Sequence, residues 1–176
     1  MSEGKLIYLS LGSNLGDRAA NLENAIEALS ENGVRVLRRS SIYETEPVDF
    51  LEQPWFLNCA VEAETSLAPR QLLEELQSIE HKLGSRKVVP RGPRIIDLDI
   101  LFYDDVVIHE AGMEIPHPRL ANRRFVLVPL AELTPGLCHP VLRKTAAELL
   151  AATQDRSAVR IWQPPQGTSG SQSKGH

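Results

Sequence analysis

Two aspartates separated by a single residue, Asp97 and Asp99, are the sharpest chemical signal in the sequence. They lie in an apolar stretch, residues 96–103, that predicts a strand, in which alternate side chains point to the same face. The two carboxylates would therefore stand side by side, and their repulsion favours a bound cation. Mg²⁺ commonly takes one or two protein carboxylates together with substrate phosphates and waters. The spacing predicts a magnesium site, and its alternative is a solvated strand face that carries two acids.

Basic side chains gather on both sides of this strand, in a chain whose formal net charge is −4. Arginine binds phosphate oxygens bidentately, and arginines beside metal-binding carboxylates are typical of phosphoryl transfer. The alternative is that these cations pair with acids of the preceding helical segment, as surface charges often do. The cations are Arg86, Lys87, Arg91 and Arg94 before the strand and Arg119, Arg123 and Arg124 after it, and the acids are Glu74, Glu75 and Glu80.

Aromatic side chains and one amide follow the proline-rich connection at residues 46–54: they are Trp55, Phe56 and Asn58. Aromatic rings next to a single amide suit a flat heterocycle, which can stack on the rings and form hydrogen bonds at its edge. The alternative is that Trp55 and Phe56 are ordinary core residues at the start of a strand. By themselves these residues leave both interpretations open.

The segment from Gly12 to Asp17, Gly-Ser-Asn-Leu-Gly-Asp, lies between a predicted strand and a predicted helix. Such turns often bind phosphate, but this one lacks the lysine and the spacing of a P-loop. We therefore predict a strand-to-helix turn in which Asp17 caps the helix.

The elements that must position these residues follow from hydrophobic periodicity. Two helices are predicted, one from Asp17 to just before Gly33, and one from Pro69, in its first turn, to Gly84 at its C-cap. The order strand, helix, strand, strand, helix, strand is typical of α+β, ferredoxin-like folds, in which a mainly antiparallel sheet is flanked by helices. The predicted strands span 5–11, 34–43, 57–65, 96–103 and 106–108, and two later helices span 123–133 and 144–152.

Length and composition favour one domain. The chain has 176 residues, and we expect residues 1–162 to form a single domain and the Pro-, Gly- and Ser-rich residues 163–176 to be a disordered tail. No apolar stretch approaches the roughly 20 residues of a membrane span, and no signal peptide is recognisable. Two isolated cysteines, Cys59 and Cys138, are expected to be reduced thiols. These features predict a cytoplasmic location.

Five motifs, taken together and in order, resemble the 6-hydroxymethyl-7,8-dihydropterin pyrophosphokinase family over residues 6–150. The resemblance implies that the diphosphate of ATP is transferred to the hydroxymethyl group of the pterin, with release of AMP, in folate biosynthesis. It also implies the ferredoxin-like fold already predicted. The motifs are Gly-Ser-Asn-Leu-Gly at 12–16, Ser-Ile-Tyr-Glu-Thr-Glu-Pro at 41–47, Gln-Pro-Trp-Phe-Leu-Asn at 53–58, Gly-Pro-Arg-Ile-Ile-Asp-Leu-Asp-Ile-Leu at 92–101 and Ile-Pro-His-Pro-Arg at 115–119.

The resemblance assigns roles residue by residue. Asp97 and Asp99 would hold two Mg²⁺ ions that bridge ATP and orient the pterin hydroxyl, and Arg94 would stabilise charge on the leaving AMP. Phe56 and Phe125 would sandwich the pterin ring, and Asn58 would bind its edge. The full ATP site would be Gln77, Glu80, Arg94, Ile100, His117 and Arg123, and the full pterin site would be Thr45, Val48, Phe56, Asn58 and Phe125.

The chain departs from the family pattern at two positions. Arg91 stands where members usually have tryptophan, and Ser85 stands where they usually have arginine, so Arg86 would take that catalytic place. The expected partners are ATP and the pterin, bound by a monomer without nucleic acid or membrane. A module that senses a metal–nucleotide complex without any transfer is the first alternative. A single-stranded RNA binder is disfavoured, because Asp97 and Asp99 would repel a phosphate backbone.

Overall fold

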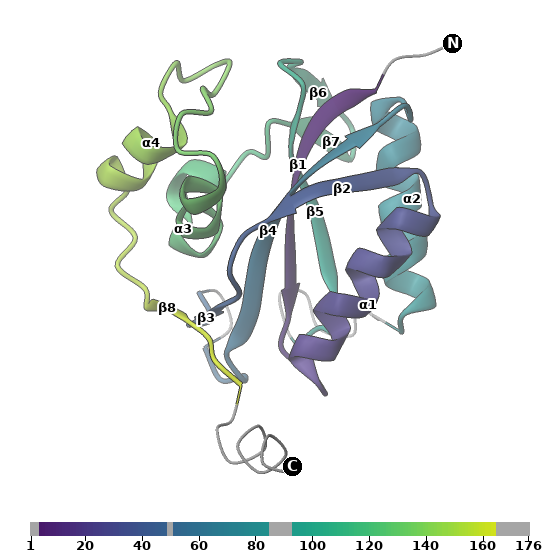
Figure 1. The fold of residues 1–176 in the computed structure, drawn as a ribbon. Helices are drawn as coiled ribbons and strands as arrows, with labels where there is room; N and C mark the ends of the chain where they lie inside the picture. Colours follow the sequence, from purple (N-terminus) through teal and green to yellow (C-terminus); the bar gives the residue numbers. More distant parts are fainter. Residues whose placement is uncertain (1–3, 49–50, 85–92, 165–176) are drawn as a thin grey trace, which may run out of the picture.

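A central strand, β1 (Lys5–Ser13), organises the computed structural model, which describes residues 4–48, 51–84 and 93–164 (Figure 1). It lies between β4 (Phe56–Thr65) and β5 (Asp97–Tyr103), and pairs antiparallel with both. β2 (Val34–Arg39) and β3 (Tyr43–Thr45) pair with different parts of β4, and β8 (Val159–Ile161) pairs with β3. The order β5-β1-β4-β2, with every pairing antiparallel, confirms the predicted α+β, ferredoxin-like arrangement.

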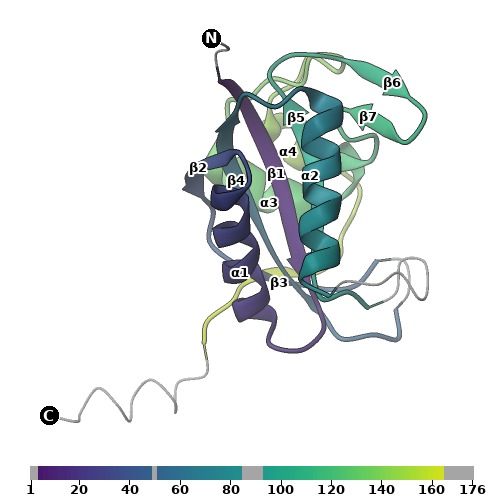
Figure 2. The same ribbon diagram turned by 90° about the vertical axis from the view of Figure 1, so that its right-hand side faces the viewer.

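Helices cover both faces of this sheet (Figures 1 and 2). α1 (Arg18–Glu31) and α2 (Pro69–Lys82) lie side by side on one face, and α3 (Arg124–Leu133) and α4 (Ala146–Ala152) lie on the other. Alternate β1 side chains therefore enter two apolar clusters. Leu9 packs in the cluster under α1 and α2, whereas Tyr8 packs in the cluster under α3 and α4.

The helix boundaries follow the local chemistry that the sequence predicts. Asp17 caps α1, since its Oδ1 accepts the Ala20 N–H at 3.1 Å. Pro69 is the first residue of α2, where its missing N–H costs no hydrogen bond. Gly84 follows the end of α2 with φ +95°, a conformation that favours glycine. The last helix begins at Ala146 rather than residue 144, because Thr145 caps it by accepting the Glu148 N–H at 3.1 Å.

The prediction of one strand over 34–43 is wrong, because the chain forms β2 and β3 with a break between them. At the break, the Ser40 hydroxyl accepts the Ala60 N–H at 2.9 Å, so a side chain takes the place of a ladder carbonyl. The strand expected at 106–108 also lies later, at β6 (Ile108–Glu110), and pairs with an unpredicted β7 (Met113–Ile115).

A bulge in β5 breaks the alternation of side chains along this strand. Strand alternation places Phe102 with Leu98 and Ile100, but Phe102 packs in the cluster under α3 and α4. The cause is an extra residue: Leu9 pairs with Ile100 and Tyr8 pairs with Phe102, so Leu101 is skipped. Asp97 and Asp99 precede the bulge and keep the predicted alternation.

Two further predictions concern the C-terminal tail and membrane-spanning helices. Residues 165–176, most of the expected tail, lie outside the described residues. Within the described part of the chain, no helix has the length and apolar character needed to cross a membrane.

Candidate functional site

One cavity brings together most of the residues that the sequence singles out. It is lined by all five expected pterin residues, Thr45, Val48, Phe56, Asn58 and Phe125, together with Arg94, Asp97, Asp99 and Arg123. These residues come from β3, β4, β5 and the start of α3, which are far apart in the sequence. The two carboxylates share one cavity, as the predicted strand alternation requires.

The floor of this cavity is the end of β1. Gly12 lies between Asn58 of β4 and Asp97 of β5, and Ser10 is paired with Asp99. A Cβ atom at Gly12 would lie 2.5 Å from Asn58 Nδ2, far inside van der Waals contact. The absence of a side chain at Gly12 thus leaves the space in which the Asn58 amide lies against β1.

The orientation of the Asn58 amide is fixed by buried hydrogen bonds. Thr45 Oγ1 donates to Asn58 Oδ1 at 2.5 Å, and Asn58 Nδ2 donates to the Leu11 carbonyl at 3.4 Å. Both Asn58 and Thr45 are buried. A buried amide held in this way can present its edge to only a narrow range of ligand groups, which suits recognition of a heterocycle.

Asn14 links the two halves of the site. Its backbone N–H donates to the Arg94 carbonyl at 3.0 Å, and its Oδ1 accepts the Arg94 N–H at 2.7 Å. Its Nδ2 donates to Gln53 Oε1 at 2.8 Å and to the Pro54 carbonyl at 3.0 Å. The turn that contains Asn14 therefore joins the segment of Arg94 to the segment that leads into Phe56.

Arg94 is largely buried and has one donor without a partner among the described residues. Its side chain is only 12% exposed, and Nη1 lies 3.5 Å from Asp97 Oδ1. Its Nε is buried and has no hydrogen-bond partner among the described residues. A buried donor without a partner is costly, and an anionic ligand in the cavity would satisfy it.

A second cavity adjoins the first at Asp99, which lines both. Its lining combines apolar side chains, among them Leu73, Leu98 and Ile100, with His117 and with the acids Glu110 and Glu114. Of the other residues expected to bind ATP, Gln77 is exposed on α2, and Glu80 Oε2 accepts the Leu98 N–H at 2.7 Å. The structure thus gives Glu80 a role in holding α2 against β5.

The tautomer of His117 follows from its hydrogen bond. Its Nδ1 accepts the Arg119 N–H at 3.1 Å, so the neutral ring carries its proton on Nε2. Burial, and the charges of Arg123 and Arg119, lower the pKa of His117 to about 4. At neutral pH the ring is therefore an uncharged donor beside the second cavity.

The donor set at the cavity limits how a metal could be held. No cluster of three or more His, Cys, Asp or Glu side chains suited to a metal occurs within residues 4–48, 51–84 and 93–164. Asp97 and Asp99 fit a hard cation that takes its other ligands from phosphate and water. The expected catalytic Arg86, and the departures at Ser85 and Arg91, lie outside the described residues.

Sequence reasoning missed several residues of the site, because only their position in the fold reveals them. Ser10, Gly12, Gln53, Glu46 and Pro47 line the first cavity. Gly12 and Asn14 belong to a motif assigned to a simple turn, and the bonds of Asn14 to residues 39 and 80 positions away carry no local signal.

Comparison with known proteins shows the family of the chain. The family model of 7,8-dihydro-6-hydroxymethylpterin-pyrophosphokinase (HPPK) matches residues 8–135. The chain belongs to this family. It is 44% identical over 163 residues to 2-amino-4-hydroxy-6-hydroxymethyldihydropteridine pyrophosphokinase of Bacillus subtilis. The aligned residues cover 92% of this chain and 93% of the relative.

Some of the relatives are much longer proteins. The chain is 48% identical over 139 residues to the folic acid synthesis protein fol1 of Pneumocystis carinii, which covers 79% of this chain but only 19% of that protein. The chain therefore spans about a fifth of the length of this fungal relative. The solved structure of Plasmodium falciparum HPPK-DHPS has the same fold, with a TM-score of 0.69 at 19% identity over 85% of this chain and 44% of that one.

Proposed function

We propose that this HPPK-family chain transfers the diphosphate of ATP to the hydroxymethyl group of 6-hydroxymethyl-7,8-dihydropterin and releases AMP, as a step of folate biosynthesis. The observation that carries the proposal is that Asp99 lines both cavities. A pterin between Phe56 and Phe125 and a nucleotide beside Ile100 and His117 would meet at this carboxylate. The name of the Bacillus subtilis relative supports the same pair of substrates.

The first cavity suits the pterin. Phe56 and Phe125 would stack on the two ring faces, and the fixed Asn58 amide would bind the ring edge. Thr45 and Val48 would offer backbone groups to the same ring. Such a cavity, apolar on its faces and polar at one edge, orients the hydroxymethyl group rather than merely retaining the ring.

The nucleotide would be held by residues of several elements. Ile100 and His117 line the second cavity, where the His117 Nε2–H can donate to a phosphate oxygen without a change of charge. Arg123 at the start of α3 would pair with the triphosphate. As the family resemblance implies, Gln77 and Glu80 would also line the nucleotide site. Arg86 would be a further catalytic arginine.

We infer that two Mg²⁺ ions accompany ATP and are held by Asp97 and Asp99. When bound, Mg²⁺ neutralises phosphate charge and draws the two substrates together. Arg94 would donate its free, buried Nε–H to an oxygen on the side of the leaving AMP, where negative charge increases in the transition state. No pairing for a covalent intermediate is proposed, so positioning and charge neutralisation would supply most of the rate.

A pterin-dependent assay tests this function. Purified protein with ATP and Mg²⁺ should release AMP only when the hydroxymethyl pterin is present. Asp99→Asn should abolish this release, whereas Asp105→Asn, an exposed acid just after the same strand, should retain it. Release of AMP without the pterin, or full activity of Asp99→Asn, would contradict the proposal.

We further propose that residues 1–162 work as one domain and as a monomer in the cytoplasm, without nucleic acid. Support for a single domain comes from the first cavity, whose lining residues range from Ser10 on β1 to Phe125 on α3. The free thiols Cys59 and Cys138 suit a reducing compartment. The acidic pair at Asp97 and Asp99 disfavours a nucleic-acid backbone in the same cavity.

A further inference from the structure

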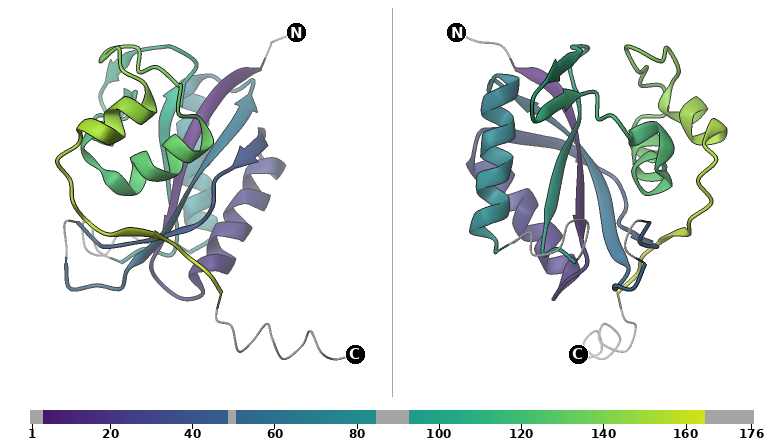
Figure 3. Two further views of the ribbon diagram at one scale, coloured as in Figure 1. Left: turned by 60° about the vertical axis from the view of Figure 1, so that its left-hand side comes forward. Right: turned by 180° about the vertical axis from the view of Figure 1, so that it is seen from behind.

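The segment that follows α4 connects two walls of the first cavity. Residues 153–162, here named the C-terminal strap, run from the end of α4 past the start of α3 to β8, which pairs with β3 (Figure 3). One wall carries Phe125 on α3, and the other carries Thr45 on β3 and Phe56 on β4. The strap itself contributes no residue to the lining of that cavity.

At the first wall, the strap holds the start of α3. Asp155 Oδ2 accepts the Arg124 N–H at 2.8 Å, and Arg124 Nε donates to the Ser157 carbonyl at 3.0 Å. Asp155 Oδ1 also accepts from the Ser157 hydroxyl at 2.7 Å. Although burial would raise the pKa of Asp155, these hydrogen bonds hold it below the ordinary value. Arg124 directly precedes Phe125, so these bonds fix the residue next to the ring.

At the second wall, the strap is a partner strand. Thr45 is opposite Val159, and the Glu46 N–H donates to the Ala158 carbonyl at 3.0 Å. The Ala158 N–H in turn donates to Glu46 Oε1 at 2.8 Å. β3 is only three residues long, so its position depends on β8 on one side as well as on β4 on the other.

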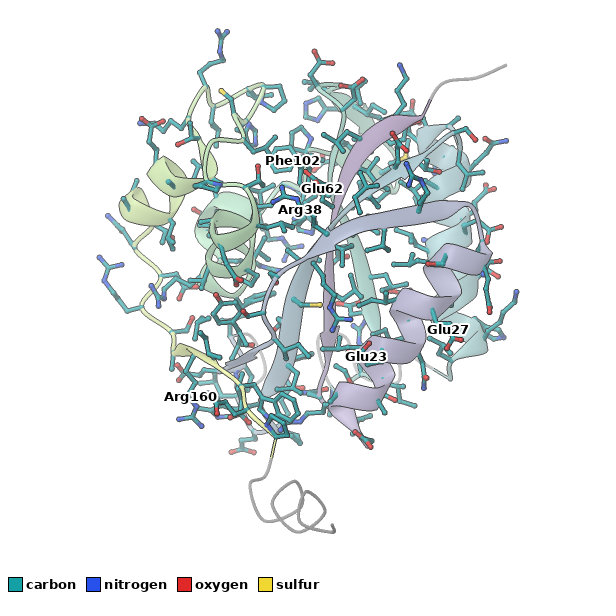
Figure 4. The ribbon with its side chains drawn as sticks, in the orientation of Figure 1. Glu23, Glu27, Arg38, Glu62, Phe102 and Arg160 are labelled. Atoms are coloured by element: carbon teal, nitrogen blue, oxygen red, sulfur yellow. The ribbon has the colours of Figure 1, made fainter. Side chains whose placement is uncertain are left out.

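Arg160 on β8, labelled in Figure 4, adds a side-chain clamp at this wall. Its Nη2 donates to Glu44 Oε1 at 3.0 Å, and its Cζ lies 4.8 Å from the centre of the Trp55 ring. Arg18 completes the clamp, since its Nη1 donates to Glu44 Oε2 at 3.0 Å and to the Trp55 carbonyl at 2.9 Å. Burial would raise the pKa of Glu44, but Arg160 and Arg18 outweigh it and lower that pKa. Trp55 directly precedes Phe56, so the clamp fixes the other aromatic wall.

We propose that the C-terminal strap sets the separation of the two aromatic walls, and that Arg160 and Asp155 are positioning residues for the pterin. The proposal rests on the function proposed above. Arg160 acts through Trp55 and Glu44, and Asp155 acts through Arg124, so neither needs to touch a substrate. The nucleotide cavity has no residue from the strap, so loosening Arg160 should weaken pterin binding and spare ATP.

The test compares two Michaelis constants in Arg160→Gln. The pterin KM, at saturating ATP, should rise about three- to tenfold, because a partly exposed cation–π contact and a surface ion pair are both lost. The ATP KM should stay within about twofold. Arg160→Lys, which keeps a cation over Trp55, should recover most of the pterin KM.

Arg35→Gln is the matched control. Arg35 also pairs with a glutamate on a neighbouring strand, since its Nη2 lies 2.7 Å from Glu64 Oε1. This pair lies toward the end of β4 that is opposite to Phe56. Its removal should leave both Michaelis constants unchanged. If Arg160→Gln fails to fold, the same ratio is measured in Glu44→Gln, which removes the other member of the Arg160 ion pair.

Two results would overturn the proposal: an unchanged pterin KM in Arg160→Gln, or equal increases of the pterin and ATP KM that Arg160→Lys does not reverse. The second result would mean that the strap serves stability alone. Failure of the underlying function would look different, because the unmodified protein would then release no AMP in response to the pterin.

Discussion

Gly12 offers the most direct test of how the site is built, because the substitution Gly12→Ala adds a single methyl group at the floor of the pterin cavity. The new Cβ would lie 2.5 Å from Asn58 Nδ2, whereas ordinary contact begins at 3.4 Å. The Asn58 amide must therefore move by about 0.9 Å. Gly12 is held between β4 and β5, so the backbone offers little room to move instead.

The size of the effect follows from the hydrogen bond that the amide loses. A displaced Asn58 can no longer accept from Thr45 Oγ1, and both groups are buried. Leaving a buried polar group without its partner costs about 1–3 kcal/mol. Loss of this bond lowers the stability of the free chain. A displaced amide would also lose its proposed hydrogen bond to the pterin edge; since about 1.4 kcal/mol corresponds to a factor of ten, a loss of the same size lowers pterin affinity about five- to 150-fold, with ATP affinity unchanged.

Calorimetric titration with the pterin, in the presence of a non-hydrolysable ATP analogue, measures this loss. Gly136→Ala is the matched control, because a Cβ at Gly136 meets no atom within 4 Å. A Gly12→Ala variant that folds and binds the pterin within about twofold of the unmodified chain would refute the reasoning.

A double-mutant cycle separates the clash from any general loss of stability. In an Asn58→Ala background the obstructing atom is gone, so Gly12→Ala should cost almost nothing further. The next contact of the new Cβ is Phe56 Cδ2 at 3.6 Å, which is an ordinary separation. Fully additive losses would mean that the methyl group acts somewhere other than the Asn58 amide.

Further predictions concern the phosphate side of the site. Asp97→Asn and Asp99→Asn should each keep the thermal unfolding temperature within a few degrees and abolish pterin-dependent AMP release, and near-full activity of either variant would contradict the metal assignment. Arg94→Ala should lower kcat more than it raises the ATP KM, if its buried Nε–H binds transition-state charge as proposed; steady-state kinetics would show equal changes if it only bound ATP. The pKa of His117 is about 4 in the folded chain, below its unfolded value near 6.5. The unfolded chain therefore binds a proton first as the pH drops, and the free energy of unfolding should fall between about pH 6.5 and pH 4. Urea unfolding across that range should show a smaller fall in His117→Gln than in the control His109→Gln, whose ring is exposed.

The parts of the site that a sequence can predict are those set by local chemistry. The alternation of a strand places Asp97 and Asp99 in one cavity, and a single carboxylate at Asp17 starts a helix. Pro69 and Gly84 delimit α2 in the same way. Each of these predictions needs only a few neighbouring residues, so no knowledge of the tertiary structure is required.

The parts that the sequence did not reveal depend on distant contacts. Arg160 bonds Glu44 across 116 positions, and Asn14 bonds Arg94 across 80. β8 has three residues and forms only because β3 offers it an edge. Similarly, the Leu101 bulge follows from the pairing with β1, which reverses the face of Phe102 without any local sign.

The Gly-Ser-Asn motif joins two segments that line the first cavity, one with Arg94 and one with Gln53. A turn that only connected β1 to α1 would need no bonds beyond its own neighbours. Asn14 instead uses its backbone and side chain to hold the Arg94 segment on one side and Gln53 and Pro54 on the other. Its buried side chain cannot shift without disturbing both. One residue therefore fixes the Arg94 segment relative to the segment that leads into Phe56, so we expect Asn14→Ala to disturb both of the proposed substrate sites.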